Sequence, residues 1–139
     1  MVVLSRLLDL AEFYQPPFRI RPEAVVEVSS TDSEGATIRR AVDVLVVSGR
    51  LWVVAIEAKM TTFALNVALP QALSDMLASP QAVAFGLLTN GAEFAFVKLA
   101  QGESPQFAVS RTFSLYAPGN ELAEVLKILR HLGQKLISD

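Results

Sequence analysis

The sequence has no cysteine and only one histidine among its 139 residues. The lack of cysteine excludes a disulfide framework and a thiolate metal site, and it is typical of cytoplasmic proteins, so we expect the protein to be cytoplasmic. The single histidine, His131, is expected near the outer face of its helix. It gives no basis for a histidine-based metal site or for a Ser–His–Asp triad.

Charged residues are also few, at 19%, whereas hydrophobic residues reach 52% and the mean hydropathy is +0.41. This composition excludes a disordered chain and predicts one folded domain over residues 1–139. The apolar surplus predicts a homodimer interface or a surface covered by another segment. No apolar run reaches membrane-spanning length, and Asp9 and Glu12 interrupt the N-terminal apolar register, so we expect neither membrane insertion nor a signal peptide.

Positive charge is scarce as well, because 12 Lys and Arg residues against 14 Asp and Glu residues give a formal net charge of −2. This balance counts against tight, non-specific binding of nucleic acid, although it allows a local basic cleft. The chain has no G-x-x-x-x-G-K-[ST] loop, which excludes a P-loop motor within it.

Hydrophobic periodicity predicts an alternation of helices and strands. A helix over Val3–Tyr14 is expected to stop before Pro16–Pro17, and a first strand is expected over Ala24–Ser29. A helix is expected to start at Pro70, and a final helix to follow the N-cap Asn120. Two strands flank the turn dipeptide Asn90–Gly91, and a short edge strand follows them. These three strands are expected at Ala82–Thr89, Ala92–Leu99 and Gln106–Ser110.

The stretch from Ala41 to Met60 departs from a purely apolar pattern. It reads as two strands joined by a Gly-containing turn, apolar on both faces, so we expect it in the middle of a sheet that is covered on both sides. Asp43, Glu57 and Lys59 nevertheless lie within or directly after these strands. Burying such charges is costly unless they are paired or bind a metal.

Strand alternation places Glu57 and Lys59 on one face, but the position of Asp43 depends on the turn. A three-residue turn, Ser48–Arg50, sets Asp43 opposite Ala55 with Glu57 on the adjacent diagonal. We therefore predict this turn, or a β-bulge with the same effect. Asp43 and Glu57 on opposite faces would refute a shared metal site.

These residue types suit a site for Mg²⁺, with Mn²⁺ as a substitute. Mg²⁺ binds through one or two carboxylates and completes its shell with water and phosphate oxygens, so Asp43 and Glu57 are candidate ligands, with the backbone carbonyl of Ala58 as a third. Lys59 would lie beside the attacking water and the scissile phosphate. The alternative is an ordinary structural salt bridge between Lys59 and one acid.

An Asp on one strand and Glu-x-Lys on the next resemble the active-site motif of the PD-(D/E)xK nucleases. The resemblance extends along the chain to the bacterial restriction endonuclease subunit R-like proteins, related to the N-terminal nuclease domain of type I restriction enzyme R subunits. The similar segments are FYQPPFRI, VDVLV, LWVVAIEAK, ALPQAL, DMLASP and FGLLTNGAEFAFVKL.

This resemblance implies an α/β fold (α+β in some schemes) with a restriction-endonuclease-like core. The core is a central mixed sheet flanked by helices, in the order α-β-β-β-α-β, with an extra hairpin strand and a C-terminal helix. It implies a Mg²⁺-dependent DNA endonuclease of restriction type in which Asp43, Glu57 and Lys59 are catalytic and Gln71 is accessory. A homodimer is expected because one active site cuts one strand, and other subunits of a restriction system are potential partners.

Further residues are candidates for the same site. Arg39 and Arg40 are the best placed for phosphate contacts, together with Arg19, Arg21 and Arg50, although arginines beside turns are often merely solvated. Acids at Asp9, Glu12 or Glu27 are either additional site residues or, more commonly, solvated. Two alternative functions stay open: a catalytically silent binding or interaction module with the same fold, and a nuclease acting on RNA or branched DNA.

Overall fold

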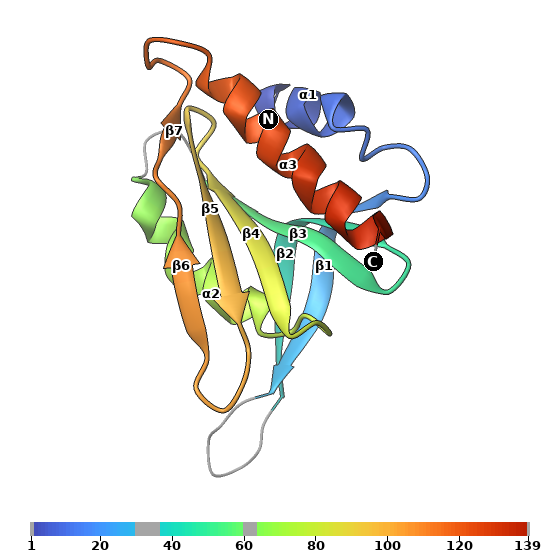
Figure 1. Cartoon of the computed structure of the whole chain (residues 1–139). Coiled ribbons are helices and arrows are strands. Elements are labelled where there is room, and N and C mark those ends of the chain that lie inside the picture. Colours follow the sequence, from blue (N-terminus) through green and yellow to red (C-terminus); the bar gives the residue numbers. More distant parts are fainter. Residues whose placement is uncertain (1, 30–36, 60–63, 139) are drawn as a thin grey trace.

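A mixed seven-stranded β-sheet forms the centre of the molecule, with helices on both of its faces (Figure 1). The computed structural model describes the backbone of residues 2–29, 37–59 and 64–138, and the side chains of residues 3–25, 42–59 and 64–135. In chain order the elements are α1 (Val2–Leu10), β1 (Arg19–Ser29), β2 (Thr37–Ser48), β3 (Leu51–Ala58), the 3₁₀ helix η1 (Leu65–Ala68), α2 (Leu69–Met76), β4 (Val83–Thr89), β5 (Glu93–Ala100), β6 (Gln106–Val109), β7 (Phe113–Ser114) and α3 (Glu121–Ser138).

The strands follow one another across the sheet from β1 to β6, and β7 pairs with β5 beside this path. Every neighbouring pair is antiparallel except β3 and β4, which are parallel. Parallel strands need a crossover connection, and η1 and α2 provide it here. The predicted mixed sheet flanked by helices, with a C-terminal helix, is confirmed.

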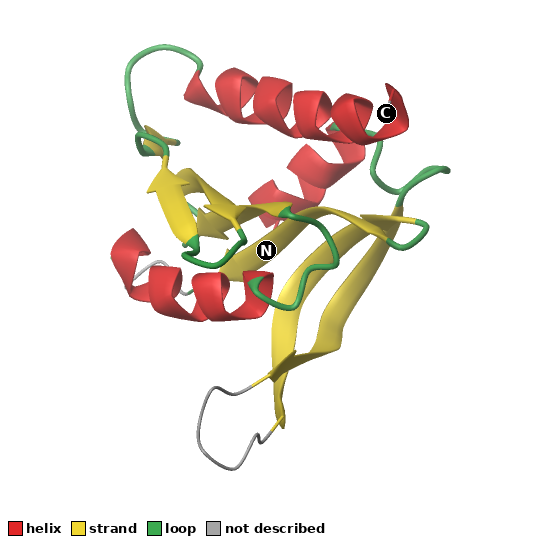
Figure 2. Ribbon diagram, turned by 60° about the horizontal axis from the view of Figure 1, so that its bottom comes forward, coloured by secondary structure: helices red, strands yellow, loops and turns green. Residues whose placement is uncertain are grey.

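The sheet lies between two helical layers, with α1 and α3 on one face and α2 on the other (Figure 2). The first core, under α1 and α3, contains residues such as Leu8, Ile56 and Leu129. The second core, under α2, contains Leu45, Ala55 and Met76 among others. Because both faces of the sheet are covered, its central strands are apolar on both sides, as predicted. No helix in the described ranges is both long and apolar enough to cross a membrane.

The N-terminal segment differs from its prediction at two points. Helix α1 ends at Leu10 rather than Tyr14, because Glu12 takes a positive φ of 67° that a helix cannot accommodate. This turn brings Phe13 into the core, where it is fully buried against Phe18 with ring centroids 5.0 Å apart. Strand β1 begins at Arg19, earlier than expected. Outside this segment, the short strand β7 was not predicted.

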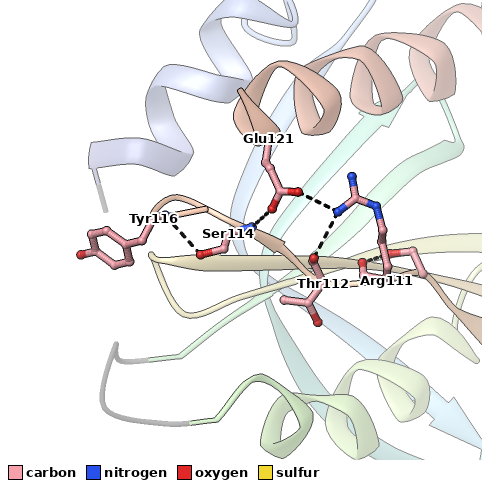
Figure 3. Close-up of polar contacts among 6 residues, drawn as sticks. Arg111, Thr112, Ser114, Tyr116 and Glu121 are labelled. Carbon is pink, nitrogen blue, oxygen red and sulfur yellow. Dashed lines mark hydrogen bonds and ion pairs between the residues drawn. The ribbon is translucent and has the colours of Figure 1, made fainter. Parts of the chain in front are cut away.

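Polar contacts hold the N-terminal end of α3 against the strand that precedes it (Figure 3). The predicted cap is confirmed, because Asn120 Oδ1 accepts a hydrogen bond from the Ala123 N–H at 3.2 Å. The Glu121 carboxylate accepts from the Ser114 N–H and from Arg111 Nη1, each at 2.8 Å. The hydrogen bond from Ser114, followed by that from Arg111, lowers the pKa of Glu121 below its ordinary value.

The turn between β2 and β3 is shorter than predicted. Ser48 pairs directly with Leu51, which leaves a two-residue turn, Gly49–Arg50, in place of the expected three residues. Gly49 has a φ of 62°, and a positive φ at the first central position is the geometry for which type II′ hairpins use glycine. Continued without a break, this register would set Asp43 opposite Ile56, with Glu57 on the other face.

A β-bulge corrects this register. Val47 pairs with Trp52 but Val46 pairs with Val54, so Val53 is an extra residue in β3. Accordingly, Val53 and Val54 both belong to the core under α1 and α3. Beyond the bulge Val44 pairs with Ile56, and one further step along the register sets Asp43 opposite Glu57. The bulge that we predicted as an alternative to the longer turn is therefore present, and the two acids share a face.

The side chain of Gln81, just before β4, supports the strand at this bulge. Gln81 Oε1 accepts a hydrogen bond from the Trp52 N–H at 2.7 Å, and Gln81 Nε2 donates one to the Trp52 carbonyl at 3.0 Å. The amide thus binds the peptide groups of the residue that precedes Val53, much as a neighbouring strand would.

We expect Gln81→Ala to lower the free energy of unfolding by about 1–3 kcal/mol, because the half-buried Trp52 would lose both partners. Urea denaturation followed by circular dichroism measures this change. Gln106→Ala, at an exposed position of β6, is the matched control and should change stability little. Equal effects of the two substitutions would contradict the supporting role of Gln81.

Candidate active site

Glu57 lies near the C-terminal end of β3 and is an unusual residue for a sheet interior. Its side chain is 2% exposed, and its Oε1 atom has no hydrogen-bond partner among the described residues. Desolvation is the main cause that raises its pKa to about 8, followed by the negative charge of Asp43 and by the hydrogen bond and charge of Asp75. All of these causes raise the pKa, so no described cation compensates the buried carboxyl group.

Asp43 reaches the same place from the neighbouring strand β2. Its side chain is half-buried, and its Oδ2 atom accepts a hydrogen bond from the Ala58 N–H at 2.9 Å. This contact ties the carboxylate to the peptide group that directly follows Glu57. The predicted juxtaposition of Asp43 and Glu57 is therefore confirmed. The hydrogen bond from the Ala58 N–H links the two strands at this point.

Asp75, on α2, is absent from the residues that we predicted for the site. It is 1% exposed, and it contributes a side-chain hydrogen bond to Glu57 from the opposite layer. The sequence does carry a signal for it, because helical spacing places Asp75 on the same face as the buried residues Ala72 and Met76. An acid at a core position of a helix is unusual, and this one faces the acids of the hairpin.

Lys59 follows β3 directly and is half-buried. Its N–H donates to the Thr89 carbonyl at 2.8 Å, which continues the pairing of β3 with β4 and fixes the backbone at this residue. Within the described part of the chain Lys59 forms no ion pair with an acid, so the alternative interpretation as a structural salt bridge finds no support there.

The other candidate residues are placed as follows. Gln71 is half-buried in the first turn of α2, one helical turn before Asp75 and therefore on the same side of the helix. Asp9 and Glu12 are exposed, which favours the solvated interpretation, and His131 is exposed as expected. The arginines at 19, 21 and 50 are exposed, whereas the side chains of Glu27, Arg39 and Arg40 lie outside the described residues.

Two of these acids, Asp43 and Glu57, fit a hard divalent cation by their chemistry. Carboxylate oxygens are the preferred ligands of Mg²⁺, and the buried Oε1 atom of Glu57 is an acceptor without a donor. As they stand, the described residues contain no group of three or more His, Cys, Asp or Glu side chains arranged to hold a metal. The fit is therefore to two carboxylates, with water and substrate oxygens completing the shell, which is a usual arrangement for Mg²⁺.

In comparisons with known proteins, no family model, no curated protein and no solved structure matches the chain. The resemblance to PD-(D/E)xK nucleases thus remains a hypothesis based on the residues of this site.

The raised pKa of Glu57 makes stability depend on pH. Since the folded state keeps the proton up to about pH 8 and the unfolded state loses it near 4.5, the free energy of unfolding should fall as the pH rises between these values. Glu57→Gln removes this loss. In EDTA we expect the variant to melt roughly 5 °C above the wild type at pH 8.5, and close to the wild type at pH 5.

Thermal unfolding at the two pH values measures this difference, with Glu103→Gln at an exposed position as control. A melting-temperature difference that is the same at both pH values would show that the ionisation of Glu57 is not its cause.

Proposed function

We propose that the protein is a Mg²⁺-dependent endonuclease that hydrolyses phosphodiester bonds of DNA, in the manner of restriction-type nucleases. The observation that carries the proposal is the shared face of Asp43 and Glu57, produced by the bulge in β3 and followed by Lys59. A buried Glu beside a second acid, with no described cation to compensate them, is costly to maintain. Such an arrangement is typical of functional sites.

Asp43 and Glu57 would hold the cation, with the carbonyl of Ala58 as a further ligand. When bound, Mg²⁺ supplies a Lewis acid that activates a water molecule and neutralises charge on the phosphate oxygens. The Ala58 N–H keeps the Asp43 carboxylate in place through its 2.9 Å hydrogen bond. Lys59, fixed through its backbone to Thr89, orients the attacking water and stabilises charge on the scissile phosphate.

Two exposed arginines of the edge strand β1, Arg19 and Arg21, support a polyanionic substrate despite the net charge of −2 and despite Glu23 in the same strand. Arg21 pairs with Leu45 across β1 and β2, and Leu45 lies in the core on the α2 side of the sheet. Strand alternation therefore places Arg21 on the face that carries Asp43, which lies two residues before Leu45 in β2. Because β1 is an edge strand, its exposed arginines are accessible to phosphate groups.

The same proposal includes the partners expected from the resemblance. One site of this kind cuts one strand, so cleavage of both strands of a duplex calls for a homodimer. Arg39 and Arg40 are proposed to contact phosphate, and Gln71 to assist at the site from the first turn of α2.

We expect the purified protein to nick supercoiled plasmid DNA in Mg²⁺ or Mn²⁺ and to be inactive in EDTA. Lys59→Ala and Asp43→Asn should each slow nicking by roughly 100-fold or more, because each removes a group that acts on the transferring phosphoryl group or its metal. Agarose gels of the plasmid forms measure the rates. Lys98→Ala, at an exposed lysine of β5, is the control and should cleave at the wild-type rate.

Activity that survives both site substitutions would locate the chemistry elsewhere or indicate a contaminant. Cleavage of RNA or branched DNA in a parallel assay, without cleavage of the plasmid, would change the substrate and keep the site. Absence of cleavage from every substrate and metal would favour a catalytically silent binding module.

A further inference from the structure

The carboxyl group of Asp75 is nearly as buried as that of Glu57, with exposed fractions of 1% and 2%. The two acids come from different layers, because Asp75 is on α2 and Glu57 is on the sheet below it. A charged residue at a core position of a helix adds nothing to apolar packing and has a desolvation cost. Its position next to the predicted metal ligand therefore calls for an explanation.

Close packing of α2 on the sheet brings the two acids together. Small side chains, Ala68 and Ala72, are buried at the contact. Gly86, in β4 below, leaves room for Met76, because a Cβ atom there would lie 2.8 Å from the Met76 sulfur. Since Met76 is the neighbour of Asp75, this approach brings even a short Asp side chain within hydrogen-bond reach of Glu57.

A second observation points to a ligand at this place. Although Asp43 and Asp75 both contact Glu57, its Oε1 atom is buried and has no hydrogen-bond partner among the described residues. A buried acceptor without a donor is costly unless something else binds it. A cation at this atom would supply the missing interaction.

We infer that Asp75 is a positioning residue: its carboxyl group and that of Glu57 share one proton in a hydrogen bond, which holds Glu57 and keeps Oε1 directed to the bound cation. This inference rests on the proposed function and adds Asp75 to the site, beside the assisting role proposed for Gln71. Gln71 is half-buried one turn earlier, and no hydrogen bond joins it to Glu57 among the described residues. Hydrogen bonds of this kind orient metal ligands, and their loss commonly reduces metal affinity or activity.

The test compares Asp75→Asn with Asp75→Ala. Asparagine has nearly the same shape and can donate a hydrogen bond to the Glu57 carboxylate, whereas alanine cannot. We expect Asp75→Ala to weaken Mn²⁺ binding by roughly 10- to 100-fold and to lower kcat for plasmid nicking, with KM for DNA unchanged. We expect Asp75→Asn to stay within a few-fold of the wild type in both measurements.

Isothermal titration with Mn²⁺ alone measures the affinity without DNA, and circular dichroism checks that each variant is folded. Asp9→Ala, at an exposed acid of α1, is the control and should bind Mn²⁺ as the wild type does. If Asp75→Ala does not fold, Asp75→Ser carries the same comparison, because the serine hydroxyl lies closer to the backbone than the Asp carboxyl group does.

The outcomes separate this inference from the proposed function. Wild-type affinity and kcat in Asp75→Ala would overturn the role of Asp75 and leave the nuclease in place. Equal losses in the Asn and Ala variants would also overturn it, because the charge of Asp75 rather than its hydrogen bond would then matter. A wild-type protein that neither binds Mn²⁺ nor nicks DNA would overturn the proposed function, and the inference with it.

Discussion

Strand alternation ties the direction of every side chain in β2 and β3 to the register between them, so a shift of one residue exchanges the two faces. The bulge at Val53 sets this register for the half of the hairpin that carries the acids. It brings Glu57 to the α2 side of the sheet, on which Asp43 of β2 also lies. The contact with Ala58 and the contact between Glu57 and Asp75 both depend on this arrangement. The local backbone at Val53 therefore determines which face of the sheet carries Glu57, four residues away.

The acids lie in an apolar surrounding, and their burial does not stabilise the fold. Cores on both faces of the sheet surround the hairpin, and they offset the cost of a carboxyl group that burial and neighbouring acids drive towards its protonated form. Proteins commonly accept such local instability where a site needs it. The parallel pairing of β3 with β4 serves the site as well, because it extends to Lys59 through Thr89 and so fixes the residue after the strand.

Much of the fold follows from periodicity and turn chemistry. Apolar runs on both sides of Asn90–Gly91 predicted β4 and β5 closely, and Asn120 predicted the start of α3. These signals are local and act within a few residues. The end of α1 was missed because Glu12 adopts a positive φ, a conformation that its residue type does not favour and that tertiary packing of Phe13 selects.

For the site, residue types were more informative than geometry. Asp43, Glu57 and Lys59 stand out because charge is improbable in apolar strands. The position of the bulge could not be predicted from the sequence, because the adjacent residues Val53 and Val54 are equally suited to either face of the sheet. Asp75 belongs to a short helix whose approach to the sheet depends on Gly86 and on small residues far apart in sequence, so its contact with Glu57 is a tertiary property.

Helix α2 has only eight residues, and yet it closes one side of the carboxyl cluster. Undocking this helix would admit water to Glu57 and relieve the desolvation of its charged form, so ionisation and undocking are thermodynamically linked. Alkaline conditions therefore favour a locally opened state in which the amides of α2 exchange with solvent. The helix that closes the carboxyl cluster is in this way also the segment whose local unfolding reports on the ionisation of Glu57.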